Sequence, residues 1–163
     1  EVYRSGKPGF AALVREFGRE VVGSDGEIDR KQLGARVFGS PEALERLNAI
    51  VHPLIRAEIE RRIEDLRRAA EVPAVVVEAA ILLEAGWRSL VDRVWVVTAP
   101  ADHVAARLAS QRGLSAAEVQ ARVARQMSDA DRLRAADAVI ENRGSIQELR
   151  GEVVRLWRSA TTR

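Results

Sequence analysis

The chain of 163 residues is 47% hydrophobic and has 26 basic and 24 acidic residues, a net charge of +2. This length suits one domain with its own core, and so small a net charge does not indicate nucleic-acid binding. No stretch approaches the roughly 20 apolar residues of a membrane span, and the absence of cysteine excludes disulfides and thiolate metal sites. We therefore expect a cytoplasmic protein that binds neither nucleic acid nor membranes; the sequence indicates no oligomeric state.

The first third of the chain predicts consecutive helices. Apolar residues recur at helical spacing from Phe10 to Phe17, and Gly18 should end that helix. Asp29 with Gln32 has the pattern of a capping box, and Ser40-Pro41 is a further helix start.

The helix from Pro41 should break or kink at His52-Pro53, because proline disfavours helical dihedral angles in the residue before it. An amphipathic helix should follow, with Ile55 and Ile59 on its apolar face. We interpret residues 1–72 as a helical subdomain inserted before a sheet, and residues 73–163 as the rest of the core.

A strand is expected at Val75 to Val77, because three β-branched residues without alternation are typical of a strand buried on both faces. Glu78 stands where this strand should end. Ligands bind at the carboxyl ends of strands in open α/β sheets, so Glu78 is a site candidate. The alternative is a solvated acid without a role.

Strands and helices alternate in the remaining sequence. Buried strands are expected at Arg93 to Thr98 and Ala138 to Ile140, with a helix from Pro100 between them. Capping patterns predict further helix starts at Ser115, Ser128 and Ser145. This alternation predicts an α/β fold with a parallel sheet and right-handed crossovers.

Short motifs stand along nearly the whole chain. In chain order they are Phe17-Gly18, Asp25 to Arg30, Val37-Phe38, Ile50 to Ile55, Ile81 to Glu84, Arg112 to Ser115, Gln126, Ala136-Asp137 and Val139 to Asn142. No single motif is specific, but their order and spacing together resemble the dephospho-CoA kinase family, which catalyses the last step of coenzyme A synthesis. The run from Glu78 to Trp87 has glutamate and alanine where the family usually has aspartate and proline, and is more similar to the kinase domain of bifunctional CoA synthases.

The resemblance implies a P-loop NTPase-like, three-layer parallel sheet with an inserted helical substrate domain and a short helical lid at about residues 112–132. It also implies transfer of the γ-phosphoryl group of ATP, with Mg²⁺, to the ribose 3′-hydroxyl of dephospho-CoA. Such chemistry needs a glycine-rich phosphate loop, yet Gly-x-x-x-x-Gly-Lys-Ser/Thr is absent from these residues.

Glu1 to Tyr3 read as the middle of a helix, so we interpret the sequence as a fragment. The first strand, the P-loop, the first helix and the aspartate base of the family would then lie upstream. We expect no catalytic residue in this chain and no activity of the fragment alone.

Three residues are candidates for binding ATP. Arg112 and Arg132 flank or follow the implied lid, where arginines can clamp phosphates bidentately. Asn142 follows the last strand and would lie near the adenine, although Asn-Arg-Gly is also an ordinary turn sequence.

The resemblance implies five candidates for binding the substrate: Arg30, His52, Glu78, Leu82 and Glu84. Each has a structural alternative: a salt bridge for Arg30, a hydrogen bond at a helix junction for His52, a core position for Leu82 and a helix cap for Glu84. No direct metal ligand is expected, and Glu78 could hold a magnesium-bound water.

Two other functions remain open. Another P-loop nucleotide or small-molecule kinase could have similar helices and a similar lid, but His52-Pro53 and the segment around Glu84 favour a dephospho-CoA kinase. A non-catalytic binding module belongs to a different class, and it is favoured only if no phosphate loop accompanies these residues.

Overall fold

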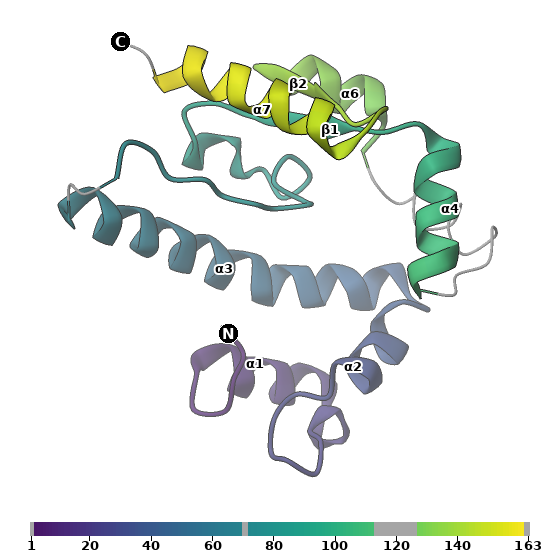
Figure 1. The fold of residues 1–163 in the computed structure, drawn as a ribbon. Helices are drawn as coiled ribbons and strands as arrows, with labels where there is room; N and C mark the ends of the chain where they lie inside the picture. Colours follow the sequence, from purple (N-terminus) through teal and green to yellow (C-terminus); the bar gives the residue numbers. More distant parts are fainter. Residues whose placement is uncertain (1, 70–71, 113–126, 162–163) are drawn as a thin grey trace. The chain divides into compact units, whose positions relative to one another are not determined.

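The computed structural model describes residues 2–69, 72–112 and 127–161 (Figure 1). The chain divides into two compact units, Glu1–Val75 and Val76–Arg163. The first unit is helical and the second contains a parallel sheet with helices. Within the described ranges, no helix has the length and apolar character needed to cross a membrane.

Helix α1 (Pro8–Phe17) opens the first unit and ends as predicted. Gly18 has φ 84°, a left-handed value that glycine adopts without steric cost, and its N–H donates to the carbonyl oxygen of Val14. A 3₁₀ turn, η1 (Arg19–Val21), follows.

Helix α2 (Arg30–Val37) begins at the predicted cap, Asp29. The Oδ1 atom of Asp29 accepts the N–H groups of Lys31 at 2.8 Å and Gln32 at 3.1 Å. The Gln32 side chain donates to Asp29 Oδ2 at 3.0 Å instead of binding the Asp29 backbone N–H, which donates to Val21 O. The helix start is therefore confirmed, with a variant of the expected capping box.

Of the break or kink predicted at His52-Pro53, the break is wrong, because α3 (Pro41–Ala69) is one continuous helix that contains Pro53; the kink stays a prediction. Its N-terminus is capped by Ser40, whose Oγ accepts the N–H of Ala43 at 3.2 Å. Proline removes only one helical hydrogen bond. Buried Val51 and half-buried Ile55 pack against the core before and after Pro53, and this packing outweighs the local preference.

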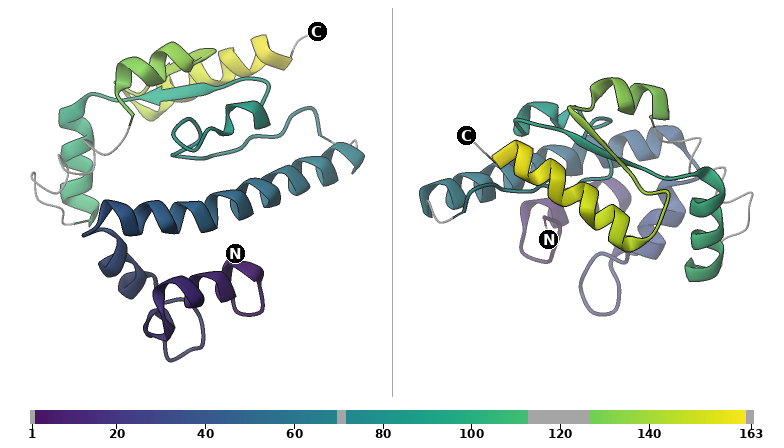
Figure 2. Two further views of the ribbon diagram at one scale, coloured as in Figure 1. Left: turned by 180° about the vertical axis from the view of Figure 1, so that it is seen from behind. Right: turned by 45° about the horizontal axis from the view of Figure 1, so that its top comes forward.

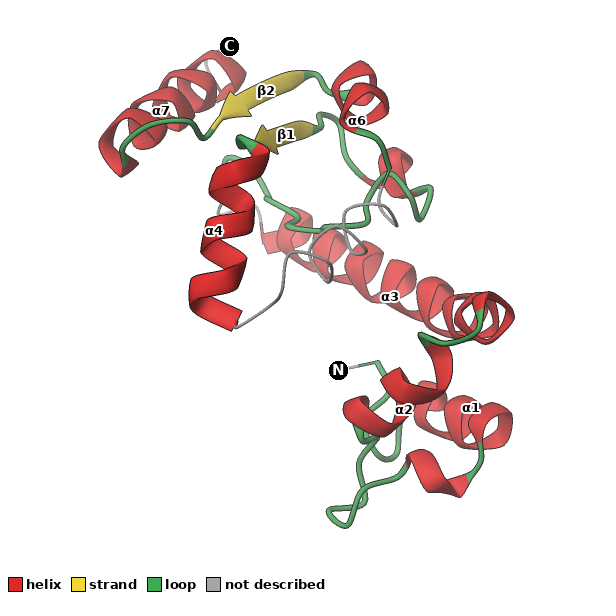
Figure 3. Ribbon diagram, turned by 90° about the vertical axis from the view of Figure 1, so that its right-hand side faces the viewer, coloured by secondary structure: helices red, strands yellow, loops and turns green. Residues whose placement is uncertain are grey.

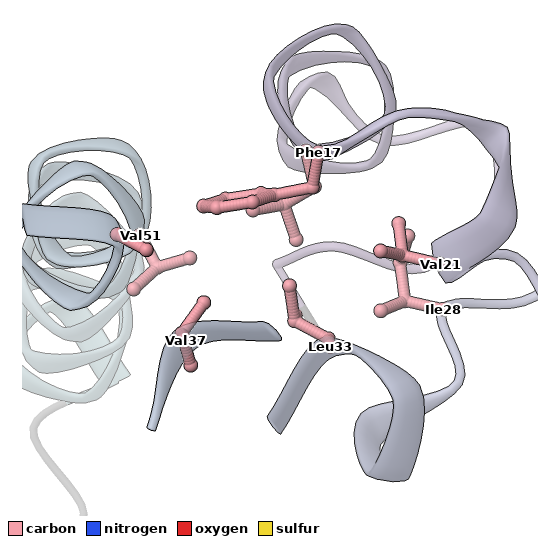
Figure 4. Packing of buried hydrophobic residues seen from close by; sticks show 8 residues of the cluster. Phe17, Val21, Ile28, Leu33, Val37 and Val51 are labelled. Carbon is pink, nitrogen blue, oxygen red and sulfur yellow. The ribbon is translucent and has the colours of Figure 1, made fainter. Parts of the chain in front are cut away.

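The core of the first unit lies among α1, α2, α3 and the turn between α1 and α2 (Figure 4). In Figure 4 the side chains of Phe17, Leu33, Val37 and Val51 face a common interior. Leu13 is fully buried and Val37 is 1% exposed. Burying such side chains is the main stabilisation of these three helices.

The described part of the second unit contains two parallel strands, β1 (Trp95–Thr98) and β2 (Ala138–Glu141), whose arrows point the same way in Figure 3. Trp95 pairs with Ala138, and Thr98 pairs with Glu141. Helices α4 (Ala101–Arg112) and α6 (Asp129–Ala135) lie between the strands in sequence. The expected α/β class with a parallel sheet is confirmed at this level.

Helix α7 (Ile146–Thr161) follows β2 and lies beside it (Figure 2). Its predicted capping box is present in reciprocal form. The Ser145 Oγ accepts the N–H of Glu148 at 3.3 Å, and Glu148 Oε2 accepts the N–H of Ser145 at 2.6 Å.

The expected strand at Val75 to Val77 is not formed; these residues are irregular, and Val76 is 78% exposed. A strand needs a neighbour for its hydrogen-bond ladder, and none of the described strands pairs with this segment. A turn over residues 80–86 follows, then a short 3₁₀ helix, η2 (Trp87–Leu90), whose Trp87 is buried.

Candidate functional site

The carboxyl edge of the sheet places Asn142 one residue beyond β2. Its backbone N–H donates to the carbonyl oxygen of Thr98 at 2.7 Å. Asn142 is half-buried, and the main-chain bond leaves its side-chain amide out of the ladder. In parallel sheets this edge is where ligands bind, so the amide stands at a common ligand-binding position.

The opposite edge of the sheet is held by Asp137, directly before β2. Its Oδ2 accepts the N–H of Val94 at 2.6 Å and Arg88 Nη2 at 2.9 Å. The Asp137 N–H donates to Val94 O at 2.8 Å, and Arg88 Nη1 donates to Val91 O at 2.8 Å. One carboxylate thus joins η2 to the starts of both strands.

Glu84 lies in the turn before η2, and its Oε1 accepts the backbone N–H of Met127 at 3.2 Å. Met127 immediately precedes Ser128, the N-cap of α6. The sequence predicts substrate binding or a helix cap for Glu84. The observed contact lies one residue before the N-cap of α6, so it is not itself a helix cap.

Arg132 lies on α6, where its guanidinium pairs with Asp129. The start of this helix is capped by Ser128, whose Oγ accepts the N–H of Asp131 at 3.1 Å. The Ser128 hydroxyl, followed by Arg134, lowers the pKa of Asp131, so this carboxylate stays charged at the positive end of the helix. Arg132 is thereby carried on a capped helix directly before β2.

Arg30 is the first residue of α2 and lies in the helical unit. Its guanidinium stacks over the Tyr3 ring, 5.7 Å from the centroid, a cation–π contact. Both residues line an open hollow of about 290 Å³ together with Glu27 and Ile28. The ring therefore restricts the guanidinium beside this hollow.

His52 lies in the interior of α3 and is half-buried. The expected role at a helix junction does not apply in that form, because α3 is continuous there. His52 and Arg30 belong to the first unit, whereas the other six candidates belong to the second.

Glu78 and Leu82 lie in the irregular segment before η2. Glu78 is exposed and follows no strand, since the segment before it is irregular. Leu82 is half-buried, and its carbonyl oxygen accepts the N–H of Trp87 at 2.8 Å. Leu82 is therefore part of a turn rather than of a fully buried core.

No group of three or more histidine or carboxylate side chains that could hold a metal ion occurs among the described residues. The expectation that Glu78 holds a magnesium-bound water involves no direct ligation and stays a prediction. Arg112 is the last residue of α4, and nothing is described of its side chain. The central part of the expected lid, residues 113–126, lies outside the described residues.

Sequence reasoning missed Arg88 and the part played by Asp137. The motif Ala136-Asp137 directly before a strand was a signal for Asp137, because an acid there can accept main-chain N–H groups. Arg88 is 49 residues away from Asp137, and no local pattern links them. The hydrogen bond between Glu84 and Met127 joins residues 43 positions apart, so no local sequence pattern predicts it either.

A family model for dephospho-CoA kinase matches residues 1–148. The chain belongs to the dephospho-CoA kinase family. A dephospho-CoA kinase from Symbiobacterium thermophilum is 48% identical over 155 residues, which are 95% of this chain and 64% of the relative. That from Moorella thermoacetica is 42% identical over 157 residues, 96% of this chain and 74% of the relative.

Two solved structures are similar to this chain over nearly its whole length. A Thermus thermophilus crystal structure has a TM-score of 0.75 at 35% identity and covers 94% of this chain and 77% of its own. A dephospho-CoA kinase from Campylobacter jejuni has a TM-score of 0.66 at 28% identity, with 94% and 78% covered. The chain thus spans about two thirds to four fifths of the length of these similar proteins.

Proposed function

We propose that this chain contributes to the ATP-dependent phosphorylation of the ribose 3′-hydroxyl of dephospho-CoA, which gives coenzyme A. The observation that carries the proposal is the match of the dephospho-CoA kinase family model to residues 1–148. The parallel strands with Asn142 at their carboxyl edge support it, because nucleotides bind at that edge in α/β folds.

In the proposed reaction the 3′-oxygen of the acceptor forms a bond to the γ-phosphorus of ATP. The bond from that phosphorus to the β–γ bridging oxygen breaks, ADP leaves, and the hydroxyl proton passes to a base. We assign none of the candidate residues as this base. Such a transfer depends on positioning and on cationic groups near the transferred phosphoryl group.

On the ATP side, Asn142 would bind the adenine, while Arg112 and Arg132 would bind phosphate oxygens. Arginine suits that task because its guanidinium binds two oxygens at once. Arg132 pairs with Asp129, so binding a phosphate would exchange one anionic partner for another.

On the acceptor side, Arg30 and His52 would bind dephospho-CoA, with the helical unit as its subdomain. The stacking of Arg30 on Tyr3 supports this assignment, since it holds a cation beside an open hollow. Glu78, Leu82 and Glu84 come from the turn segment of the second unit, where Glu84 has a structural partner in Met127.

Magnesium would accompany ATP in this reaction. The described residues offer no cluster of metal ligands, so no step in the proposal uses a metal ion bound to this chain. The absence of Gly-x-x-x-x-Gly-Lys-Ser/Thr from the 163 residues further leads us to propose that these residues alone have little or no activity.

The experiment that tests this function compares acceptors. The polypeptide expressed from the complete reading frame that encodes these residues should be assayed with ATP and either dephospho-CoA or nucleoside monophosphates. We expect ADP formation to depend on dephospho-CoA. A preference for a nucleoside monophosphate would favour a different kinase. If ADP forms with neither dephospho-CoA nor a nucleoside monophosphate, a non-catalytic binding module is favoured.

A further inference from the structure

The turn segment that contains Glu84 and Arg88 is bonded to both flanks of α6. Glu84 Oε1 accepts the N–H of Met127, directly before the N-cap of α6. Arg88 Nη2 donates to Asp137, directly after the C-cap of α6, at 2.9 Å. Two side chains four residues apart thus fasten a seven-residue helix at its two ends.

The turn between these two residues is itself ordered by main-chain bonds. The N–H of Ala85 donates to Ile81 O at 2.8 Å, and that of Gly86 donates to Leu83 O at 3.0 Å. Gly86 adopts φ 69°, in the left-handed region where glycine has no steric penalty. Trp87 follows directly and is buried. The turn between Glu84 and Arg88 is therefore held in one conformation by hydrogen bonds and by packing.

The hydrogen bonds of Asp137, the partner of Arg88, set the register of the sheet. Asp137 accepts from Val94 through its side chain and donates to Val94 through its backbone. This double contact fixes β2 beside β1 from its first residue, and the ladder then runs in register to Thr98 and Asn142. A displacement of Asp137 would therefore also displace Asn142.

We infer that Glu84 and Arg88 are positioning residues, which place Arg132 on α6 and Asn142 beyond β2 for ATP binding without touching ATP themselves. The inference rests on the proposed function, because that proposal gives Arg132 and Asn142 their roles. The inference goes beyond that proposal because it gives exposed Glu84 a role in ATP binding. Glu84 acts through the backbone N–H of Met127, which it holds next to the start of α6. The role of Glu84 is accordingly on the ATP side rather than in binding the acceptor.

The arrangement predicts a one-sided kinetic effect. Arg88→Ala removes the bonds to Asp137 and Val91, and Glu84→Ala removes the acceptor for Met127. Each should raise the KM for ATP about five- to tenfold, as expected when one or two partly exposed hydrogen bonds no longer hold a binding group in place. The KM for dephospho-CoA should stay within about twofold, since Arg30 and His52 lie in the other unit and the turn that carries Leu82 keeps its main-chain bonds in both variants.

The test uses the polypeptide from the complete reading frame, with Arg134→Ala as the matched control on α6. Arg134 pairs with Asp131 inside the helix and has no part in the contacts to the turn segment. Arg88→Lys keeps the charge but not the two-pronged contact, so it should rescue the ATP KM only in part. Amide hydrogen exchange of Met127 should accelerate in Glu84→Ala and not in Arg134→Ala.

A second set of variants asks whether the effect passes through the ATP-side residues. In an Arg132→Ala, Asn142→Ala background, Arg88→Ala should change the ATP KM by less than about twofold, because the residues that it positions are gone. An undiminished effect in that background, or equal rises in both KM values, would overturn the positioning role.

Failure of the inference can be separated from failure of the proposed function. If Arg132→Ala and Asn142→Ala raise the ATP KM while Glu84→Ala and Arg88→Ala do not, the positioning role is wrong and the ATP-side assignment stands. If Arg132→Ala and Asn142→Ala leave the ATP KM unchanged, the assignment itself is wrong and the positioning role falls with it.

Discussion

The backbone N–H of Asn142 donates to the carbonyl oxygen of Thr98 at 2.7 Å, which extends the contact between β1 and β2 beyond their last paired residues. The main chain thus fixes the position of Asn142, and the side chain can be altered without disturbing the ladder. This separation makes the proposed adenine contact testable by a single substitution.

Asn142→Ala should raise the KM for ATP about fivefold, the effect of losing roughly one net hydrogen bond of about 1 kcal/mol. Because the bond to Thr98 is made by the backbone, thermal stability should change little. Steady-state kinetics and a thermal melt check both expectations. Gln147→Ala, which removes an exposed amide five residues later, is the control; equal kinetics of the two variants would contradict the adenine role.

Removing the capping box of α7 should destabilise the protein, and a second serine in the same helix provides a matched control. Ser145→Ala removes the acceptor for the Glu148 N–H and should lower the free energy of unfolding by about 1 kcal/mol. Ser159→Ala removes a hydroxyl that donates to Leu156 O inside the same helix, and should stay within about 0.5 kcal/mol. Urea unfolding measures both, and a larger loss for Ser159→Ala would argue against the cap.

Helix starts of this kind could be read from the sequence because a cap involves residues within four positions of each other. Asp29, Ser128 and Ser145 all cap helices where their patterns predict. The ion pair of Arg88 with Asp137 could not be predicted, because it forms only after the chain brings together residues 49 positions apart.

The errors have the same physical origin. The apolar run at Val75 to Val77 carries strand propensity, yet a strand exists only where a partner supplies the ladder. Pro53 carries a local signal to end a helix, and the packing of Val51 and Ile55 overrides it. The hydrogen bond of Glu84 to Met127 was likewise not expected from the sequence.

Pro53 predicts a stability change opposite to that of most substitutions. Pro53→Ala restores a helical N–H in the middle of α3 at an exposed position, and should stabilise the protein by up to about 3 kcal/mol. Ala57→Gly, at an exposed position one turn later, should instead destabilise it by about 1 kcal/mol. Urea unfolding should show shifts of opposite sign; destabilisation by Pro53→Ala would mean that the proline ring is needed for packing.

The ion pairs of Glu58 in α3 should make a contribution to the stability of the fold that depends on pH. The guanidinium of Arg61, followed by that of Arg62, lowers the pKa of Glu58 from 4.5 to about 2. The pKa of Glu58 in the folded protein lies below its value in the unfolded chain. Its stabilising contribution is therefore complete above about pH 4.5 and is lost as the pH falls toward about 2. The thermal midpoint of Glu58→Gln should therefore lie below that of the unaltered protein at neutral pH and approach it in acid.

Salt provides the control for Glu58. The ion pairs of Glu58 are solvent-accessible, so about 1 M NaCl should reduce the difference between the two proteins at neutral pH. A difference that is the same at all pH values and salt concentrations would point to lost packing instead of charge.

The 163 residues on their own should bind ATP with a Kd weaker than about 1 mM, because they contain no phosphate loop of the Gly-x-x-x-x-Gly-Lys-Ser/Thr type. Isothermal titration calorimetry with ATP and magnesium measures this directly. Micromolar, magnesium-dependent binding would show that another arrangement of these residues holds the phosphates.

The most direct test of the central claim follows the phosphoryl group to its acceptor atom. The polypeptide from the complete reading frame is incubated with ATP, magnesium and either dephospho-CoA or its 3′-deoxyribose analogue, and the products are resolved by phosphorus NMR. We predict a new phosphomonoester on the ribose 3′-oxygen of dephospho-CoA and none with the analogue. Phosphorylation of the analogue, or no phosphorylation of dephospho-CoA, would contradict the account.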